Sequence, residues 1–132
     1  MKIAVDMDNT IIDELGSTLR PGIIKFLEIM STKHELILWT NSRRIRTMEI
    51  LDHFNIRKYF IKIISRENYD PDEKGFKKDI RIYDYDVIID DDKEEIDYNI
   101  NNGKIGILIN SYRKNKKIKE NELEEICIKY KL

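Results

Sequence analysis

Five short apolar runs, rich in β-branched residues, alternate with segments of helical periodicity, and this alternation is what most limits the fold of the chain. The runs that predict strands occupy residues 3–5, 36–39, 60–64, 87–89 and 105–109. Each run is apolar at nearly every position, which is typical of strands that are covered on both faces, as in a parallel sheet. We therefore predict an α/β fold, a doubly wound three-layer sandwich around a mostly parallel five-stranded sheet.

Helices are predicted between these runs. The first is expected to start at Pro21, a residue suited to the first helical turn. The second is expected to follow Ser42 as its N-cap and to carry Ile45 on its apolar face. Further helices are expected at about residues 93–102 and at the C-terminal end, around 123–130. Residues 65–85 contain Pro71, Gly75 and many charges, and we expect a loop there with one short helix.

Length and composition limit the class of protein. The 132 residues predict a single domain over residues 1–132, and 41% hydrophobic with 37% charged residues fits a soluble globular protein. A net charge of −1 argues against a general nucleic-acid binder. The single cysteine, Cys127, excludes an intramolecular disulfide and suits a reducing compartment. No apolar run approaches the roughly 18 residues that span a bilayer. We therefore expect a cytoplasmic protein without a membrane partner.

Polar side chains follow three of the predicted strands, at the point where each strand ends. Asp6 and Asp8 follow the first strand, Thr40 and Asn41 follow the second, and three aspartates at residues 90–92 follow the fourth. In a doubly wound fold, ligands bind beyond the carboxyl ends of the parallel strands. We therefore expect these groups to converge on one site.

A site made of several carboxylates needs a cation, because the acids otherwise repel one another and raise one another's pKa values. An all-oxygen, acid-rich site suits Mg²⁺. Asp6 and Asp8 are two residues apart, so an extended chain places both on the same side. One carboxylate can then attack phosphorus while the other gives a proton to the leaving oxygen. A hydroxyl and a lysine would hold the phosphoryl oxygens.

The stretches IAVDMDNTII, LILWTNS and DVIIDDD resemble motifs I, II and IV of the haloacid dehalogenase (HAD) superfamily of phosphohydrolases, and they occur in the same order. The resemblance covers essentially the whole chain. It implies a HAD-like Rossmannoid fold, with Asp6 as the nucleophile and Asp8 as the general acid/base. It also implies that Thr40 and Asn41 bind the substrate phosphate.

The same resemblance implies the ligands of a Mg²⁺ ion. They are the Asp6 carboxylate, the backbone carbonyl of Asp8, and the acid pair Asp90/Asp91. Because three aspartates run together, the choice between Asp90 and Asp91 as the direct ligand stays open.

Motif III of the family is a lysine between the third and fourth strands. Lys74, Lys77 and Lys78 all qualify by position. We favour Lys78, because the Lys-Asp-Ile sequence at 78–80 resembles the context of this lysine in several capless members, and we place Lys77 second.

Members of the family often carry a cap inserted after motif I or after the third strand. Here only about 30 residues separate Asp8 from Thr40, and the predicted elements fill the stretch from Thr40 to Asp90. The chain therefore resembles the capless members, such as the small carboxyl-terminal-domain phosphatases. An open site would admit a small phosphorylated molecule, a phosphoprotein or a nucleic-acid end, unless a neighbouring subunit in a homo-oligomer supplies the lid.

Two alternatives remain beside a phosphatase. One is a catalytically inactive member that only binds phosphate. The other is a receiver-like signalling domain, which also combines a phosphorylated aspartate, a threonine, a lysine and Mg²⁺ on a parallel sheet. Receivers place the phosphorylated aspartate on a middle strand, whereas FIKIIS, the third strand here, ends without one. One of Arg43, Arg44 and Arg46, which follow motif II, could also bind a second anionic group of the substrate.

Overall fold

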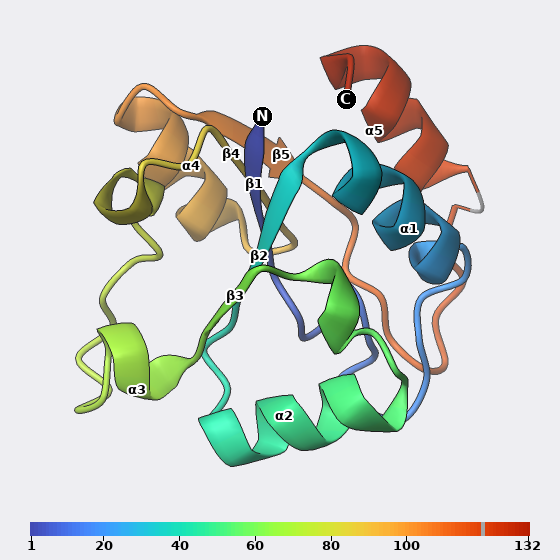
Figure 1. Cartoon of the computed structure of the whole chain (residues 1–132), viewed down its shortest axis with the longest axis horizontal. Helices are drawn as coiled ribbons and strands as arrows, with labels where there is room; N and C mark the ends of the chain where they lie inside the picture. Colours follow the sequence, from blue (N-terminus) through green and yellow to red (C-terminus); the bar gives the residue numbers. More distant parts are fainter. Residues whose placement is uncertain (120) are drawn as a thin grey trace.

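The computed structural model describes residues 1–119 and 121–132, and its centre is a five-stranded sheet (Figure 1). The strand order is β3-β2-β1-β4-β5, and every pair of neighbouring strands is parallel. The strands are β1 (Lys2–Val5), β2 (Glu35–Trp39), β3 (Lys62–Ile64), β4 (Val87–Asp90) and β5 (Ile105–Leu108). The predicted α/β fold is confirmed, and the sheet is wholly parallel.

Helices connect the strands and cover both faces of the sheet. The α-helices are α1 (Ile23–Lys33), α2 (Arg44–His53), α3 (Arg66–Tyr69), α4 (Lys93–Asn101) and α5 (Glu122–Tyr130), with short 3₁₀ turns η1 (Arg57–Tyr59) and η2 (Ile80–Tyr83). Between β3 and β4 the chain therefore forms two short helical pieces, α3 and η2, where we predicted one.

The alternation of side chains along β1 explains why the strands are apolar on both faces. Ile3 and Val5 belong to a core that includes residues of α1, α2 and α5. Ala4, between them, belongs to a second core on the opposite face, which includes Ile80 of η2 and Ile96 of α4. Figure 1 shows α1 and α5 together on one side of the strands and α4 on the other. These are the three layers that the sequence predicted.

The starts of the first two helices differ from the prediction. Gly22, with a φ of 81°, is the N-cap of α1, so the helix starts at Ile23 and Pro21 lies outside it. Arg43 is the N-cap of α2, one residue after the predicted Ser42. Local cap signals therefore located both helices to within two residues but not their first turns.

The apolar face of α2 also differs from the prediction. Its buried side chains are Thr47, Ile50 and Leu51, whereas Ile45 is 76% exposed. Ile45 precedes Thr47 by two residues, which places it about 200° around the helix, away from the core.

The strand order fixes where a ligand can bind. From β1 the chain adds β2 and then β3 on one side, and it then adds β4 and β5 on the other side of β1. The order reverses beside β1, so the crevice at its carboxyl end is the expected binding place. A receiver-like domain would have the order 2-1-3-4-5, so the sheet does not support that alternative.

The connections that the structure describes leave no cap over this end of the sheet. Between β1 and β2 the chain forms a loop and α1, and between β3 and β4 it forms α3, η2 and the segments that join them. Among the described residues, no helix is both long enough and apolar enough to cross a membrane.

The loop that leaves β1 is organised by a buried carboxylate, Asp13. Its oxygens accept hydrogen bonds from the Ser17 backbone N–H at 2.7 Å, the Ser17 hydroxyl at 2.7 Å and the Thr18 hydroxyl at 2.8 Å. Burial opposes the ionisation of Asp13, but these hydrogen bonds outweigh it and lower its pKa from 3.8 to about 2.

We expect Asp13→Asn to lower the free energy of unfolding at neutral pH. A pKa lowered on folding stabilises the fold above pH 4, and this contribution is lost as the pH falls towards 2. The difference between wild type and Asp13→Asn should therefore shrink with acidification below about pH 4. Urea unfolding at a series of pH values measures it, with the exposed Asp72→Asn as a control that should show no such trend. A difference that is constant with pH would contradict the assignment.

Candidate active site

Asp6 lies directly beyond β1 and is 6% exposed. Its backbone N–H donates to the Ile89 carbonyl at 3.0 Å, so pairing with β4 continues past the end of the strand. Its Oδ1 accepts a hydrogen bond from Lys78 Nζ at 2.8 Å, and its Oδ2 accepts one from Thr10 Oγ1 at 2.9 Å. Burial raises the pKa of Asp6 to about 6, although Lys78 acts in the opposite direction.

Lys78 is the one of the three candidate lysines that reaches Asp6. Its Nζ lies 2.8 Å from Asp6 Oδ1 and 2.8 Å from Asp90 Oδ2. Lys77 instead pairs with Glu94 at 3.3 Å, and Lys74 is exposed.

The backbone of Lys78 is fixed by two buried side chains of α4. Its N–H donates to Glu95 Oε2 at 2.7 Å, and its carbonyl accepts from Asn99 Nδ2 at 2.8 Å. Neither Glu95 nor Asn99 was among the site residues predicted from the sequence. The sequence feature that could have identified them is a pair of polar residues one helical turn apart, on the side of the predicted helix that also carries the apolar Ile96.

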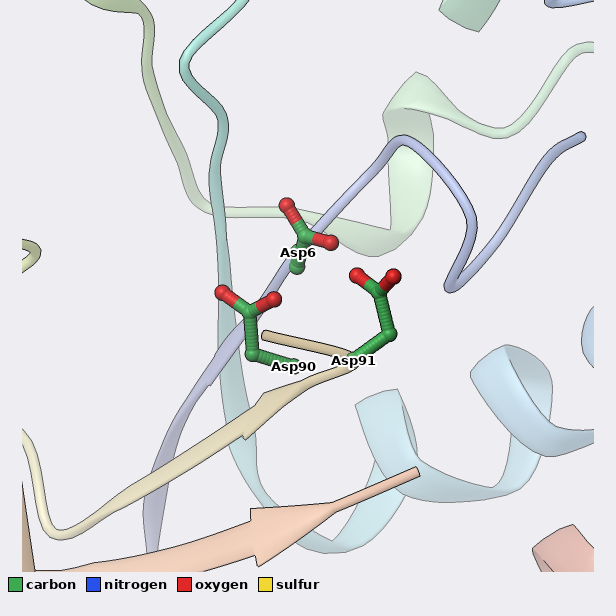
Figure 2. A group of neighbouring side chains, drawn as sticks. All are labelled: Asp6, Asp90 and Asp91. Carbon is green, nitrogen blue, oxygen red and sulfur yellow. The ribbon is translucent and has the colours of Figure 1, made fainter. Parts of the chain in front are cut away.

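Asp90 and Asp91 lie beside Asp6 at the end of β4. Carboxylate oxygens of the three residues lie within 4.8 Å of one another, and Figure 2 shows the three carboxyl groups gathered around one point. Burial raises the pKa of Asp90 to about 6 and also raises that of Asp91. Lys78 pairs with two of these three carboxyl groups, those of Asp6 and Asp90, so the three acids together outnumber the ammonium beside them. This all-oxygen donor set fits Mg²⁺.

The contacts of Asp90 and Asp91 differ. Asp90 is 1% exposed, and its oxygens accept from Lys78 Nζ at 2.8 Å and from the Asp92 backbone N–H at 3.0 Å. Asp91 is half-buried, and its Oδ1 lies 3.5 Å from Thr10 Oγ1. Asp91 therefore has more freedom than Asp90 to bind a further cation.

Asp8 lies on the same side of the chain as Asp6, because Met7 between them is fully buried in the core. Its carboxylate is outside the three-carboxylate group and pairs with Arg46, whose Nη1 lies 2.9 Å from Asp8 Oδ1. The same nitrogen donates to Ser42 Oγ at 3.0 Å. The pair is partly exposed, so we expect it to orient Asp8 more than to stabilise the fold. From the sequence, Arg46 was one of three arginines of which one could bind a second anionic group of the substrate, and its pairing with Asp8 was not predicted.

Thr40 and Asn41 lie at the end of β2. Thr40 is 1% exposed, and its backbone N–H donates to the Ile64 carbonyl at 2.9 Å. Its Oγ1 accepts from the Ser42 backbone N–H at 3.0 Å, which leaves the hydroxyl proton free to donate to a ligand. Asn41 is exposed, and its carbonyl accepts from Arg66 Nε at 2.9 Å.

Arg20 supports the turn that carries Asp8 and Thr10. It is 1% exposed, its Nε donates to the Thr10 carbonyl at 2.6 Å, and its Nη1 pairs with Glu122 of α5 at 3.2 Å. Asn9, in the same turn, has a positive φ of 63° and accepts a further bond from Arg20 Nη2 at 3.3 Å. Asparagine tolerates this conformation better than most residues. Arg20 was not among the site residues predicted from the sequence.

An open cavity of about 420 Å³ lies beyond the ends of these strands. All the site residues proposed from the sequence line it, namely Asp6, Asp8, Thr40, Asn41, Lys78, Asp90 and Asp91. The fold thus brings together the groups that a phosphoryl transfer needs: a buried carboxylate, a second carboxylate, a lysine, a hydroxyl and a place for a cation.

A parallel α/β sandwich with this acidic site defines a phosphohydrolase of the HAD superfamily, the class that the sequence motifs resemble. Within it, the family model described as NLI interacting factor-like phosphatase matches residues 2–131. The chain belongs to this family of phosphatases, and the predicted HAD membership is confirmed.

Solved structures share the fold at low sequence identity. An uncharacterized protein from Listeria monocytogenes serotype 4b superposes with a TM-score of 0.70 and 16% identity, over 99% of both chains. A HAD-superfamily hydrolase of subfamily IA from Geobacter sulfurreducens PCA superposes with a TM-score of 0.68 and 10% sequence identity, over 96% of this chain and 97% of that chain. A third structure is the fission yeast RNA polymerase II CTD phosphatase Fcp1, as a variant bound to beryllium fluoride. It superposes with a TM-score of 0.66 and 17% sequence identity, over 97% of this chain and 50% of that chain. The search of curated proteins found no match.

Proposed function

We propose that this phosphatase hydrolyses a phosphomonoester in a Mg²⁺-dependent reaction, through an aspartyl-phosphate formed on Asp6. The observation that carries the proposal is the setting of the Asp6 carboxylate. It is buried, is held by Lys78 at 2.8 Å and Thr10 at 2.9 Å, and lines a cavity shared with Asp8 and Thr40. Each carboxylate oxygen has more than one lone pair, so Asp6 keeps an electron pair for attack despite both hydrogen bonds.

The reaction that these residues support has two steps. A carboxylate oxygen of Asp6 attacks phosphorus and forms an acyl phosphate, while the bond to the leaving oxygen breaks and Asp8 gives that oxygen a proton. Asp8 then takes a proton from a water molecule, which attacks the same phosphorus and releases Asp6 and inorganic phosphate. The Lys78 ammonium and the Thr40 hydroxyl would donate to the phosphoryl oxygens in both steps.

The metal would be held by the carboxylates of Asp6 and Asp91 and, as in the resembling family, by the backbone carbonyl of Asp8. We choose Asp91 as the direct ligand because it is half-buried and open to the cavity, whereas Asp90 is 1% exposed and its carboxylate is held by Lys78 and by the Asp92 N–H. Asp90 would then position Lys78. When bound, Mg²⁺ would supply positive charge to the phosphoryl oxygens and to the acid cluster.

Removal of Mg²⁺ with a chelator is expected to abolish turnover, and addition of Mg²⁺ should raise the melting temperature. At about ten times its Kd, the ion should raise the melting temperature by roughly 5 °C, because it relieves carboxylate repulsion only in the folded state. Asp91→Ala should raise the Mg²⁺ concentration for half-maximal activity by more than about tenfold. The control Asp92→Asn removes the charge of an exposed neighbouring acid, keeps a side chain able to cap α4, and should change this concentration little. Full turnover in excess chelator would contradict the mechanism.

The absence of a cap between the described elements favours an open site, so we propose that bulky phosphate esters enter as well as small ones. A phosphoprotein is one candidate, because the fission yeast structure with this fold is a phosphatase of the RNA polymerase II CTD. The range of substrates can be tested by measuring phosphate release from phosphopeptides, nucleotides, nucleic-acid ends and sugar phosphates, with and without Mg²⁺. Strict preference for small esters would instead indicate a lid from a second subunit, and gel filtration would then show an oligomer.

We also propose a cytoplasmic location for this protein. Its support is the single cysteine, which suits a reducing compartment.

A further inference from the structure

Phe76 is an exposed aromatic residue at the candidate active site. Its side chain is 56% exposed, and it lines the same cavity as Asp6 and Lys78. Of the strongly exposed large hydrophobic side chains among residues 1–119 and 121–132, it is the one that lines this cavity. Scattered exposed hydrophobic residues are normal on protein surfaces, so the meaning of Phe76 depends on how it is held and on what surrounds it.

The backbone on both sides of Phe76 is fixed. Before it, the buried carboxylate of Asp70 accepts the N–H groups of Lys74 at 2.8 Å and Gly75 at 2.9 Å. After it, the backbone of Lys78 is bonded to the α4 side chains Glu95 and Asn99. The ring of Phe76 is therefore presented from an anchored segment, two residues before the lysine that reaches Asp6.

The rest of the cavity wall disfavours a leaving group that carries additional negative charge. Acidic side chains outnumber the two lysines that line the cavity. Lys78 is engaged by Asp6 and Asp90, and Lys77 is paired with Glu94. Beyond the single phosphoryl group, an uncharged group therefore fits this wall better than a second anion.

A second aromatic side chain, Tyr69 of α3, lines the same cavity. Its ring packs edge-on against the buried Trp39, with 5.5 Å between the ring centroids. This contact holds the Tyr69 ring in place, so the cavity is lined by one packed aromatic ring and by the exposed ring of Phe76, whose backbone is anchored on both sides. Aromatic rings pair favourably in offset-stacked or edge-to-face arrangements.

We propose that Phe76, with Tyr69, forms a subsite for an aromatic ring carried by the leaving group of the phosphomonoester. The inference rests on the proposed phosphatase function and names the substrate class for that site. The ring can be attached directly to the ester oxygen, as in phenyl phosphate and phosphotyrosine, or through a sugar, as in a nucleoside monophosphate. In both cases Phe76 determines specificity and takes no part in the chemical steps.

The test measures binding of non-hydrolysable phosphonates by calorimetry with Mg²⁺ present, so that it does not depend on turnover. Wild type should bind phenylphosphonate roughly tenfold more tightly than ethylphosphonate. Phe76→Ala should lose most of this preference while its affinity for ethylphosphonate stays unchanged, and Phe76→Trp should keep the preference. Ile82→Ala, which removes an exposed side chain outside the cavity lining, is the matched control and should behave as wild type.

A second pair of ligands, the non-hydrolysable methylenephosphonate analogues of adenosine 5′-monophosphate and of ribose 5-phosphate, separates the two sources of the ring. If only the preference for phenylphosphonate depends on Phe76, the ring of the substrate is attached directly to the ester oxygen. If only the preference for the nucleotide analogue depends on Phe76, the ring is attached through a sugar. Either result supports the inference. If Phe76→Ala leaves both preferences intact, or weakens the ringless ligands equally, the inference is wrong. If wild type binds none of the four phosphonates, the proposed function itself fails, and the subsite with it.

Discussion

Asp6→Asn is expected to abolish phosphoester hydrolysis and to leave the protein folded. An amide cannot form the acyl phosphate, so kcat should fall by a factor on the order of 10⁴ or more, as when other enzymes lose their nucleophile. The buried Asp6 carboxylate has a pKa raised to about 6, so its ionisation costs stability at neutral pH. The neutral amide avoids this cost, and the melting temperature at pH 7 should be unchanged or higher. Steady-state kinetics and thermal unfolding measure the two effects.

Asp8→Asn is the matched comparison for this experiment. It changes the second carboxylate of the same motif, but it should leave the nucleophile in place and slow the proton transfers. When the phosphorylated intermediate of the wild-type protein is trapped, the phosphoryl group should be found on Asp6. Trapping on any other residue would overturn the assignment.

Lys78→Met is expected to reduce both turnover and stability. The ammonium lies 2.8 Å from both Asp6 and Asp90, and its side chain is 6% exposed. Loss of a buried donor to the reacting group should lower kcat by about 10²–10³-fold. Two buried carboxyl groups would also be left without their shared cation, which should cost about 3 kcal/mol of unfolding free energy at neutral pH.

The stability loss in Lys78→Met should depend on pH. Asp6 and Asp90 already have pKa values raised to about 6, and loss of Lys78 raises them further. An acid whose pKa is raised on folding destabilises the fold when it ionises, so the deficit should be small at pH 5 and should grow towards pH 8. Urea unfolding in chelator at the two pH values measures it. Lys77→Met, which removes a surface pair, is the control and should change stability by less than about 0.5 kcal/mol. A fully active Lys78→Met protein would mean that another lysine serves the site.

The layers of the fold and the carboxyl ends of the strands could be predicted from the sequence, because both depend on local patterns. A strand with helices packed on both of its faces is apolar at nearly every position. The first polar residue after it marks where the strand leaves these helical layers. The same local rule placed Asp6 and Asp8 on one side of the chain, since Met7 between them is buried. The first turns of α1 and α2 were harder, because they depend on backbone conformation at Gly22 and Arg43.

Tertiary structure decided which of the candidate side chains meet. Lys78 reaches Asp6 across 72 residues of sequence because Glu95 and Asn99 of α4 hold its backbone, and its neighbour Lys77 is left to pair with Glu94. The pairing of Arg46 with Asp8, 38 residues apart, likewise requires α2 and the turn after β1 to be in place. Side-chain type and spacing repeat along a chain and can be read locally. Which of several equivalent lysines or arginines faces a buried carboxylate depends on contacts between distant segments, and these exist only after the layers have packed.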